Sequence, residues 1–252
     1  MIKLFITDID GCLSIPFETP DWELLSQIRR LNQQSIHDMA VPPLTICSGR
    51  PLSYVEAVVQ WLGIDRPTVF ESAGIYTLED NNIQFLPSFD EKAAQQVAEI
   101  KHWMKEKIMP LDDGLVPEFT KKMDAGIIHL EKNVIDDIYP TIKKYVEAEY
   151  PRFEVHQTEV SINVILKNNT KKNGIMALCD QMDIAPSEAA YIGDSSGDIS
   201  GLKIVGRAFA PNNAAEEVKE HAEVLEESVT RALLKAYRTV IQDNRKMLAD
   251  AE

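Results

Sequence analysis

The sequence predicts an α/β protein in which a smaller α+β domain interrupts a core built on a parallel β-sheet. Near both ends of the chain, short apolar runs alternate with amphipathic helical patterns, and this rhythm is typical of β-α-β units. In the middle, the pattern changes to short strands suited to antiparallel pairing. We therefore expect a Rossmann-like core at residues 1–80 and 166–252 and an inserted α+β domain at residues 81–165.

The first third of the chain supplies the beginning of the sheet. Ile2–Thr7 is a short, mostly apolar run that stops at Asp8, as expected of a buried parallel strand. Pro51 suits the first position of a helix that ends at Gly63. The elements expected here are strands at residues 2–7, 43–47 and 67–71 and helices at about residues 21–34 and 51–63.

The remaining two thirds change pattern and then change back. Gly74–Leu78 and Ile83–Leu86 flank a short polar turn and predict a β-hairpin. The inserted domain is expected to contain helices at about residues 91–107 and 134–149 and strands at residues 126–130, 152–156 and 159–166. The last third is expected to contain a helix at about 171–182, strands at 189–192 and 207–210, a short helix near 199 and two final helices.

The composition disfavours several classes of partner. With 252 residues, of which 44% are hydrophobic, the chain can form one large domain or two unequal ones. A net charge of -14 disfavours nucleic acids and anionic membranes. An odd number of cysteines, the lack of a long apolar run and a first segment that is typical of a strand lead us to expect a cytoplasmic protein. The tryptophans lie in helical patterns and are expected to be buried or half-buried (Trp22, Trp61, Trp103).

Two pairs of aspartates follow predicted strands. Asp8 and Asp10 come after the first strand, and Asp194 and Asp198 follow the strand that ends at Gly193. The carboxyl ends of parallel strands meet at one edge of a sheet, and carboxylate oxygens are the ligands that Mg²⁺ prefers. The alternative is that these aspartates have no catalytic function. The first pair would then belong to a solvated acidic loop, and Asp198 would be a helix N-cap.

Candidate anion-binding groups lie at two predicted helix starts. Ser48 and Gly49 precede a helix, where a hydroxyl and exposed backbone N–H groups can bind an anion. Lys171 and Lys172 open a later helix, although the helix dipole disfavours a cation there. This suggests a second role for one of the lysines, while ordinary surface lysines remain the alternative.

Taken together, these groups resemble the four signatures of the haloacid dehalogenase-like hydrolase superfamily. The signatures match Asp8–Gly11, Ser48, Lys171, and Gly193–Asp194 with Asp198. Residues 69–76 and 213–219 also resemble segments of the Cof-type and archaeal phosphoglycolate phosphatase branch, with two departures: Cys12 replaces the usual Thr and Ser72 the usual Asn. The insertion lies between the second and third signatures, where one class of cap domain of this superfamily sits.

The resemblance implies a magnesium-dependent phosphatase that hydrolyses a small phosphomonoester, such as phosphoglycolate or a sugar phosphate, through a phospho-aspartate. Asp8 would be the nucleophile and Asp10 the general acid and base. Ser48, Gly49 and Lys171 would bind the phosphoryl oxygens. The implied metal site comprises Asp8, the backbone carbonyl of Asp10, Asp194 and Asp198, the last of which orients a water or braces the lysine.

Residues of the cap are expected to select the substrate. Lys121 and Lys122 could contact an anionic tail, the alternative being an exposed lysine pair, and the resemblance puts Asn213 on the substrate side. We expect a small phosphorylated metabolite as partner and a monomer or homodimer. Two alternative functions are a sugar phosphomutase of the same superfamily and a phospho-accepting, receiver-type module without turnover.

Overall fold

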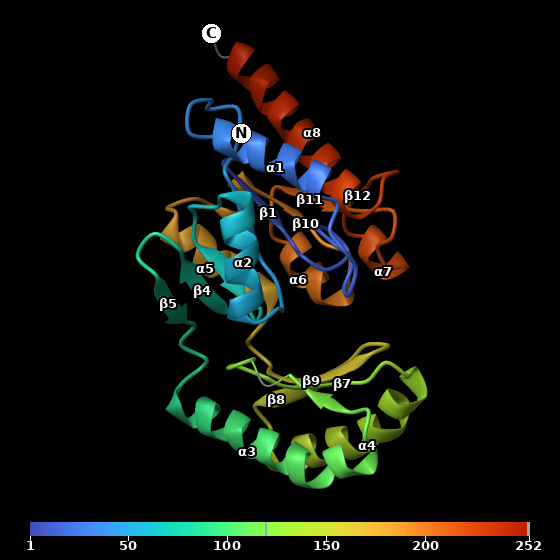
Figure 1. Cartoon of the computed structure of the whole chain (residues 1–252). Coiled ribbons are helices and arrows are strands. Elements are labelled where there is room, and N and C mark those ends of the chain that lie inside the picture. The colour runs from blue at the N-terminus through green and yellow to red at the C-terminus, as the bar shows by residue number, and fades with distance from the viewer. Residues whose placement is uncertain (119, 251–252) are drawn as a thin grey trace. The chain divides into compact units, whose positions relative to one another are not determined.

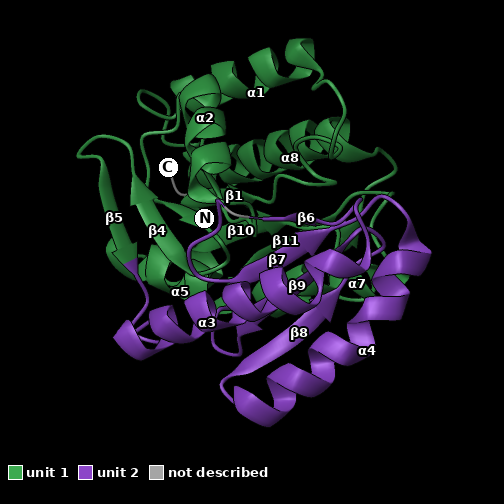
Figure 2. Cartoon of the chain, turned by 60° about the horizontal axis from the view of Figure 1, so that its bottom comes forward, with its two compact units in different colours: residues 1–84, 170–252 green, residues 85–169 purple. Residues whose placement is uncertain are grey.

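The computed structural model describes residues 1–118 and 120–250, which divide into two compact units (Figure 2). Unit 1 comprises Met1–Gln84 and Thr170–Glu252, and unit 2 comprises Phe85–Asn169. Both boundaries lie four residues later than the sequence suggested. The first boundary shifts because strand β5 (Asn82–Phe85) is hydrogen-bonded to β4 (Gly74–Thr77), so the hairpin stays largely with unit 1.

Unit 1 contains the parallel sheet that the sequence predicts. Its five strands run in the order β12-β11-β10-β1-β2, and every neighbouring pair is parallel. Thr7 at the end of β1 lies opposite both Ile46 and Ile192, so β1, β2 and β10 end at the same level. The strands are β1 (Leu4–Thr7), β2 (Leu44–Ile46), β10 (Ala189–Ile192), β11 (Arg207–Ala210) and β12 (Glu223–Val224).

Helices cover both faces of this sheet (Figure 1). On one face, Leu4 and Ile6 of β1 join a buried apolar cluster with Ile175 of α5 and Leu202 of α6. On the other face, the Phe5 ring lies 4.8 Å from the Tyr237 ring of α8, as the alternation of side chains along a strand requires. The helices of unit 1 are α1 (Trp22–Gln34), α2 (Leu52–Leu62), α5 (Lys171–Gln181), α6 (Ile199–Leu202), α7 (Glu216–Lys219) and α8 (Val229–Ala249).

The third predicted strand does not extend the parallel sheet. Strand β3 (Thr68–Phe70) belongs to an antiparallel sheet in the order β3-β4-β5, and an isolated parallel bridge between Cys47 and Val69 connects it to the end of β2. Glu71 and Ser72 have φ angles of 45° and 63°, and this left-handed turn reverses the chain directly after β3. Because β3 is short and turns back at once, it pairs with its own neighbour.

Unit 2 is a four-stranded antiparallel sheet with two helices on one face. Ala125, Ile127, Ile162 and Val164 of the sheet pack into one apolar cluster with residues of α3 and α4. The alternate positions, such as Asn163, lie on the opposite face. The strand order is β6-β7-β9-β8. The elements are α3 (Glu91–Lys107), β6 (Val116–Pro117), β7 (Ala125–Ile128), α4 (Lys132–Glu149), β8 (Phe153–Gln157) and β9 (Ser161–Leu166).

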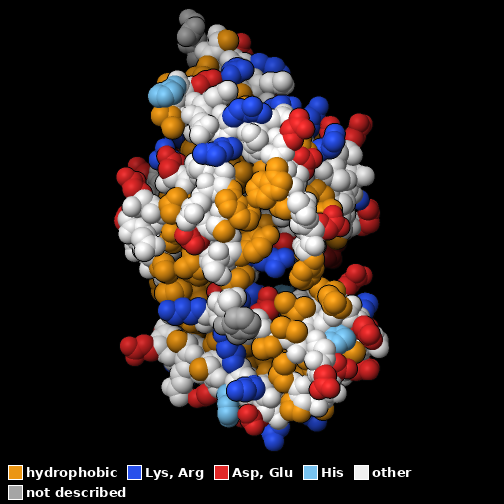
Figure 3. Space-filling view, in the orientation of Figure 1, with side chains coloured by type: hydrophobic (Ala, Val, Ile, Leu, Met, Phe, Trp, Pro, Cys, Tyr) orange, Lys and Arg blue, Asp and Glu red, His pale blue; other side chains and the backbone are white. Residues whose placement is uncertain are grey.

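Two of the three tryptophans are more exposed than the sequence suggested. Trp22 and Trp61 are 52% and 44% exposed, and their rings meet edge to face at 5.3 Å. Figure 3 shows hydrophobic side chains gathered on the surface over α1 and α2. Only Trp103 meets the expectation, since it is half-buried and stacks on Tyr145. Within residues 1–118 and 120–250, no helix has the length and apolar character needed to cross a membrane.

Candidate active site

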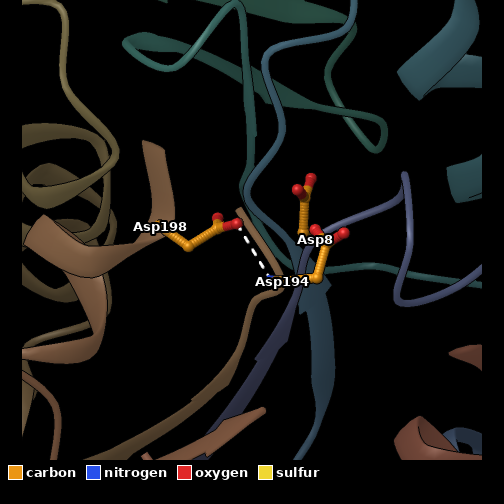
Figure 4. Close-up of side chains that lie close together, drawn as sticks. All are labelled: Asp8, Asp194 and Asp198. Atoms are coloured by element: carbon orange, nitrogen blue, oxygen red, sulfur yellow. Dashed lines mark hydrogen bonds between the residues drawn. The ribbon is translucent and has the colours of Figure 1, made fainter. Parts of the chain in front are cut away.

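Three of the four predicted aspartates meet at the carboxyl edge of the parallel sheet: Asp8, Asp194 and Asp198. Because β1 and β10 end in register, Asp8 and Asp194 leave the sheet side by side. Asp198 points toward them from the start of the following short helix (Figure 4). Carboxylate oxygens of the three residues lie within 4.8 Å of one another.

The Asp8 carboxylate accepts two hydrogen bonds. The Ile9 N–H donates to its Oδ1 at 2.7 Å, and the Lys171 ammonium donates to its Oδ2 at 2.6 Å. The side chain is almost fully buried. Burial raises the pKa of Asp8 to about 6, although Lys171 acts in the opposite direction. A buried carboxylate with a cationic partner is suited to react with an anion once further positive charge is present.

Lys171, and not Lys172, reaches the carboxylates. Lys171 is the first residue of α5, whose N-cap Thr170 accepts a hydrogen bond from a backbone N–H of the first turn. Its buried ammonium forms ion pairs with both Asp8 and Asp198. Burial alone would lower the pKa of Lys171, but Asp198 and Asp8 hold it well above its ordinary value. Lys172, in contrast, is exposed. The ion pairs with Asp8 and Asp198 explain why Lys171 stands at a helix start, where the helix dipole disfavours a cation.

Asp198 is fully buried and accepts hydrogen bonds at both oxygens. Lys171 and Tyr191 donate to its Oδ1. The Asp194 N–H, the Ser195 N–H and the Ser195 hydroxyl donate to its Oδ2 at 3.1, 2.9 and 2.9 Å. Burial tends to raise the pKa of Asp198, but the Lys171 charge and these donors hold it below its ordinary value. Asp198 therefore braces both the lysine and the loop that carries Asp194.

Two glycines allow this close packing of carboxylates. A Cβ on Gly11, which has a φ of 69°, would lie 1.9 Å from Asp194 Oδ2. A Cβ on Gly193 would lie 2.4 Å from the Asp198 Cβ. Burial, together with Asp8 and Asp198, raises the pKa of Asp194 to about 7. Clustered carboxylates with raised pKa values fit a divalent cation, which would replace the protons that they otherwise bind.

Ser48 lies next to this cluster in a turn held from two sides. Ser48 is buried, and its N–H donates to Val69 O at 3.1 Å while its carbonyl accepts from the Ser72 N–H at 2.9 Å. Its hydroxyl accepts from the Arg50 N–H at 3.3 Å. A Cβ on Gly49 would lie 3.7 Å from the Ser72 hydroxyl. Ser72, which replaces the usual Asn of the resembled family, thus supports the candidate phosphate-binding turn at Ser48 and Gly49.

Arg50 is a residue of the site that the sequence analysis missed. Its Nε donates to Asp10 Oδ2 at 2.6 Å and its terminal nitrogen donates to Asp10 Oδ1 at 2.9 Å. The Asp10 carboxylate is therefore bound at both oxygens. The available signal was only that Arg50 follows Ser48 and Gly49, and periodicity cannot reveal a partner 40 residues away.

Lys121 and Lys122 of unit 2 do not form an exposed cationic pair. Lys121 is 8% exposed, and its ammonium lies 3.0 Å from Glu118 and 3.1 Å from Asp124. It also donates to Asn163 Oδ1 at 2.9 Å. Lys122 is exposed and lies over the Phe85 ring, 4.8 Å from its centre. The charge of Lys121 is already neutralised within unit 2, so the expectation of an exposed pair is corrected.

Asn213 supports the loop after β1. Its amide nitrogen donates to Gly11 O at 2.9 Å, and its amide oxygen accepts from the Val229 N–H at 2.9 Å. Thr230 adds a second connection by donating to Leu13 O at 2.7 Å. Asn213 thus bridges the acidic loop and the start of α8.

An acid cluster held by one lysine at the carboxyl edge of a parallel sheet could hold a divalent cation at the place where α/β proteins commonly bind their ligands. The family model of haloacid dehalogenase-like hydrolases matches residues 111–232. A phosphoglycolate phosphatase of Methanopyrus kandleri is 26% identical over 226 residues, covering 89% of this chain and 90% of that protein. Another, of Methanococcoides burtonii, is 21% identical over 238 residues, covering 94% and 95%. This partial match and these relatives support the resemblance to the haloacid dehalogenase-like hydrolases, and they support an enzyme with phosphatase activity.

Solved structures share the fold at lower identity. The crystal structure of Thermoplasma acidophilum 0175 has a TM-score of 0.77 at 17% identity, covering 95% of this chain and 98% of that one. The sucrose-phosphatase of Synechocystis, solved with sucrose and phosphate, has a TM-score of 0.64 at 17% identity, with the same two coverages. These likenesses support the α/β fold that the sequence predicted.

Proposed function

We propose that this enzyme is a magnesium-dependent phosphatase that hydrolyses a small phosphomonoester through a phospho-aspartate on Asp8. The observation that carries the proposal is the hydrogen bond from Lys171 to Asp8, beside the Asp194 and Asp198 carboxylates. A nucleophilic carboxylate needs nearby positive charge to approach an anionic phosphate, and this arrangement supplies one cation and the ligands for another.

The relatives support phosphatase activity and motivate our proposal for the substrate. The two relatives described above are phosphoglycolate phosphatases, and one structural neighbour is a sucrose-phosphatase. We therefore propose phosphoglycolate or a sugar phosphate as the substrate. Both are small esters in which one phosphoryl group is attached to an alcohol oxygen.

In the first half-reaction, an Asp8 oxygen attacks phosphorus and the bond from phosphorus to the leaving oxygen breaks. The electron pair of that bond stays on the leaving oxygen, which takes a proton from the Asp10 carboxyl group. Ser48, the Gly49 backbone and Lys171 bind the phosphoryl oxygens while charge spreads over them. Mg²⁺, when bound, neutralises part of this charge, and Asp8, Asp194 and the Asp10 carbonyl would hold it, braced by Asp198.

In the second half-reaction, a water molecule attacks the phosphorus of the phospho-aspartate. Asp10, now a carboxylate, takes a proton from that water, and the bond between phosphorus and the Asp8 oxygen breaks. The products are inorganic phosphate and free Asp8. A sugar phosphomutase would differ at this step, because a second sugar hydroxyl would replace water.

Unit 2 is the candidate cap that distinguishes one leaving group from another. The residues of unit 1 described above recognise the phosphoryl group, which is common to all candidate esters, so selectivity requires other contacts. Of the two lysines considered, Lys122 is the better candidate for an anionic tail, since Lys121 is already paired with Glu118 and Asp124.

The direct test is phosphate release from a panel of metabolite phosphates with Mg²⁺, comparing the wild type with Asp8→Asn. This change is nearly isosteric and removes the nucleophile, so we expect a folded protein with no measurable turnover. Activity of Asp8→Asn within about tenfold of the wild type, roughly 1.4 kcal/mol of barrier, would contradict the proposal. Transfer between sugar hydroxyls without free phosphate would identify the phosphomutase instead.

A further inference from the structure

Arg50 binds the candidate general acid with a two-armed contact. Its Nε and one terminal nitrogen donate to the two oxygens of Asp10 at 2.6 and 2.9 Å. The two side chains are 21% and 35% exposed, so the contact lies where a substrate can reach it. A guanidinium fork fixes the plane and the direction of a carboxylate, which a single hydrogen bond does not.

The backbone of Arg50 is itself fixed by the phosphate-binding turn. Its N–H donates to the Ser48 hydroxyl at 3.3 Å, and its carbonyl accepts from the Glu71 N–H at 3.0 Å. Further along the side chain, the guanidinium carbon lies 5.1 Å from the centre of the Tyr54 ring on α2. Arg50 thus connects the turn that carries Ser48 to the loop that carries Asp10.

We propose that Arg50 is a positioning residue, which orients Asp10 for proton transfer to the leaving oxygen. This role rests on the proposed phosphatase function and adds to it. The leaving oxygen can take the proton as the phosphorus–oxygen bond breaks only if an Asp10 oxygen points at it. When one Asp10 oxygen carries the proton, Arg50 can donate only to the other oxygen. That remaining hydrogen bond keeps the protonated oxygen directed at the leaving group, and after the proton has been transferred both arms can bind the carboxylate again.

Leaving-group dependence separates this role from a general structural one. A nitrophenolate leaves readily without a proton, whereas a less acidic phenol depends on the acid. Loss of Asp10 orientation should therefore slow phenyl phosphate much more than p-nitrophenyl phosphate. Both esters have similar shapes, so a contact to the leaving group would affect them alike. The quantity to compare is kcat/KM, because it covers the steps up to the transfer of the phosphoryl group to Asp8.

The experiment uses the full chain with Mg²⁺ and the variants Arg50→Ala and Arg50→Lys. We expect Arg50→Ala to lower kcat/KM about tenfold to a hundredfold on phenyl phosphate and about threefold or less on p-nitrophenyl phosphate. Arg50→Lys should also lose more activity on phenyl phosphate than on p-nitrophenyl phosphate, because a lysine ammonium cannot reproduce the two-armed contact of a guanidinium. Added guanidinium ion should partly restore Arg50→Ala on phenyl phosphate. The matched control is Arg66→Ala. Arg66 is an exposed arginine whose Nε lies 3.4 Å from Asp65 Oδ1, so this variant should behave like the wild type on both esters.

A double-mutant cycle completes the test. In an Asp10→Asn background, Arg50→Ala should cause no further loss on phenyl phosphate, because there is no proton left to direct. Equal losses on both esters, a change in KM alone, or multiplying losses in the double mutant would each overturn the role. If Arg50→Ala fails to fold, the leaving-group selectivity of Arg50→Lys decides. No phosphate release by the wild type from either ester would instead refute the phosphatase function, and this role with it.

Discussion

The Lys171 ammonium donates to Asp8 Oδ2 at 2.6 Å and is also ion-paired with the fully buried Asp198. One cation therefore joins the candidate nucleophile to the carboxylate that braces the next loop. Replacing it in Lys171→Met leaves the buried carboxylates and the incoming phosphoryl group without this charge. We expect kcat to fall about a hundredfold or more, as when one preorganised electrostatic partner of a transition state is removed. Steady-state phosphate release measures the effect.

Lys172→Met is the matched control for this prediction. Lys172 is the next residue of α5 and is exposed, so its loss should change kcat by about twofold or less. A larger loss in Lys172→Met than in Lys171→Met would show that the wrong lysine has been assigned.

Magnesium should stabilise the protein more at high pH than at low pH. Burial raises the pKa of Asp8 to about 6 and that of Asp194 to about 7, above the ordinary value for aspartate of about 4. Between about pH 4 and pH 7 the folded protein then binds more protons at these groups than the unfolded chain does. Their contribution to stability is full below about pH 4 and is lost as the pH rises through 6 and 7. Mg²⁺ replaces these protons, so it should raise Tm more at pH 8 than at pH 5.

Thermal unfolding with and without Mg²⁺ at the two pH values tests this linkage. Asp194→Asn removes one ligand and one titrating group, and should reduce both the Mg²⁺ effect and its dependence on pH. An equal Tm shift at both pH values, or no shift at either, would show that Asp8 and Asp194 do not bind the metal.

The site residues at strand ends could be predicted because a local pattern marks them. Asp8 and Asp194 each follow a buried strand of the parallel sheet, and strand ends of such a sheet meet at one edge. Lys171 and Lys172 both attracted notice at a helix start, where the dipole disfavours a cation, and the resemblance to the family favoured Lys171. In each case the informative feature lies within a few residues of the side chain concerned.

The contacts that the sequence did not reveal are formed between distant segments. Nothing local in the sequence indicates that the fold brings Arg50 to Asp10 or Asn213 to Gly11. Strand β3 was expected in the parallel sheet, because the apolar run does not reveal the left-handed turn that reverses the chain after it. Tertiary pairing decided these cases, and a local pattern contains no information about it.

Lys121 should contribute to the stability of unit 2 more than to the choice of substrate. Its ammonium lies between Glu118 and Asp124, and the carboxylates raise its pKa although burial opposes this. Lys121→Met would remove the cation that Glu118 and Asp124 share. Breaking a buried ion pair in this way costs about 3–5 kcal/mol, so we expect a clearly lower Tm for unit 2. Differential scanning calorimetry of the full chain measures it.

Lys122→Met provides the comparison for Lys121. Lys122 is exposed over the Phe85 ring, a contact worth about 0.5–1 kcal/mol, so the Tm should change little. If Lys122 contacts an anionic tail, its replacement should lower kcat/KM on phosphoglycolate about tenfold and leave p-nitrophenyl phosphate unaffected. A stable, selectively impaired Lys121→Met protein would reverse these two assignments.

Asn213 should affect turnover through the acidic loop and not through substrate affinity. Its amide bridges Gly11 O and the Val229 N–H, both at 2.9 Å. Val229 has a φ of 49°, a strained conformation for a β-branched residue, which this hydrogen bond helps to hold. Asn213→Ala removes both hydrogen bonds and should cost about 1–2 kcal/mol of stability.

Loosening the loop beside Asp10 should lower kcat by about three- to tenfold and leave KM unchanged on both phenyl phosphate and phosphoglycolate. Thr230→Val is the parallel variant, since it removes the other connection, to Leu13 O at 2.7 Å, without touching Asn213. The two variants should behave alike, because they release the same loop from the same helix. A substrate contact by Asn213 predicts a different pattern, in which KM rises for phosphoglycolate only and Thr230→Val has no such effect. Steady-state kinetics of the two variants on the two esters therefore decides between a bridge and a binding residue.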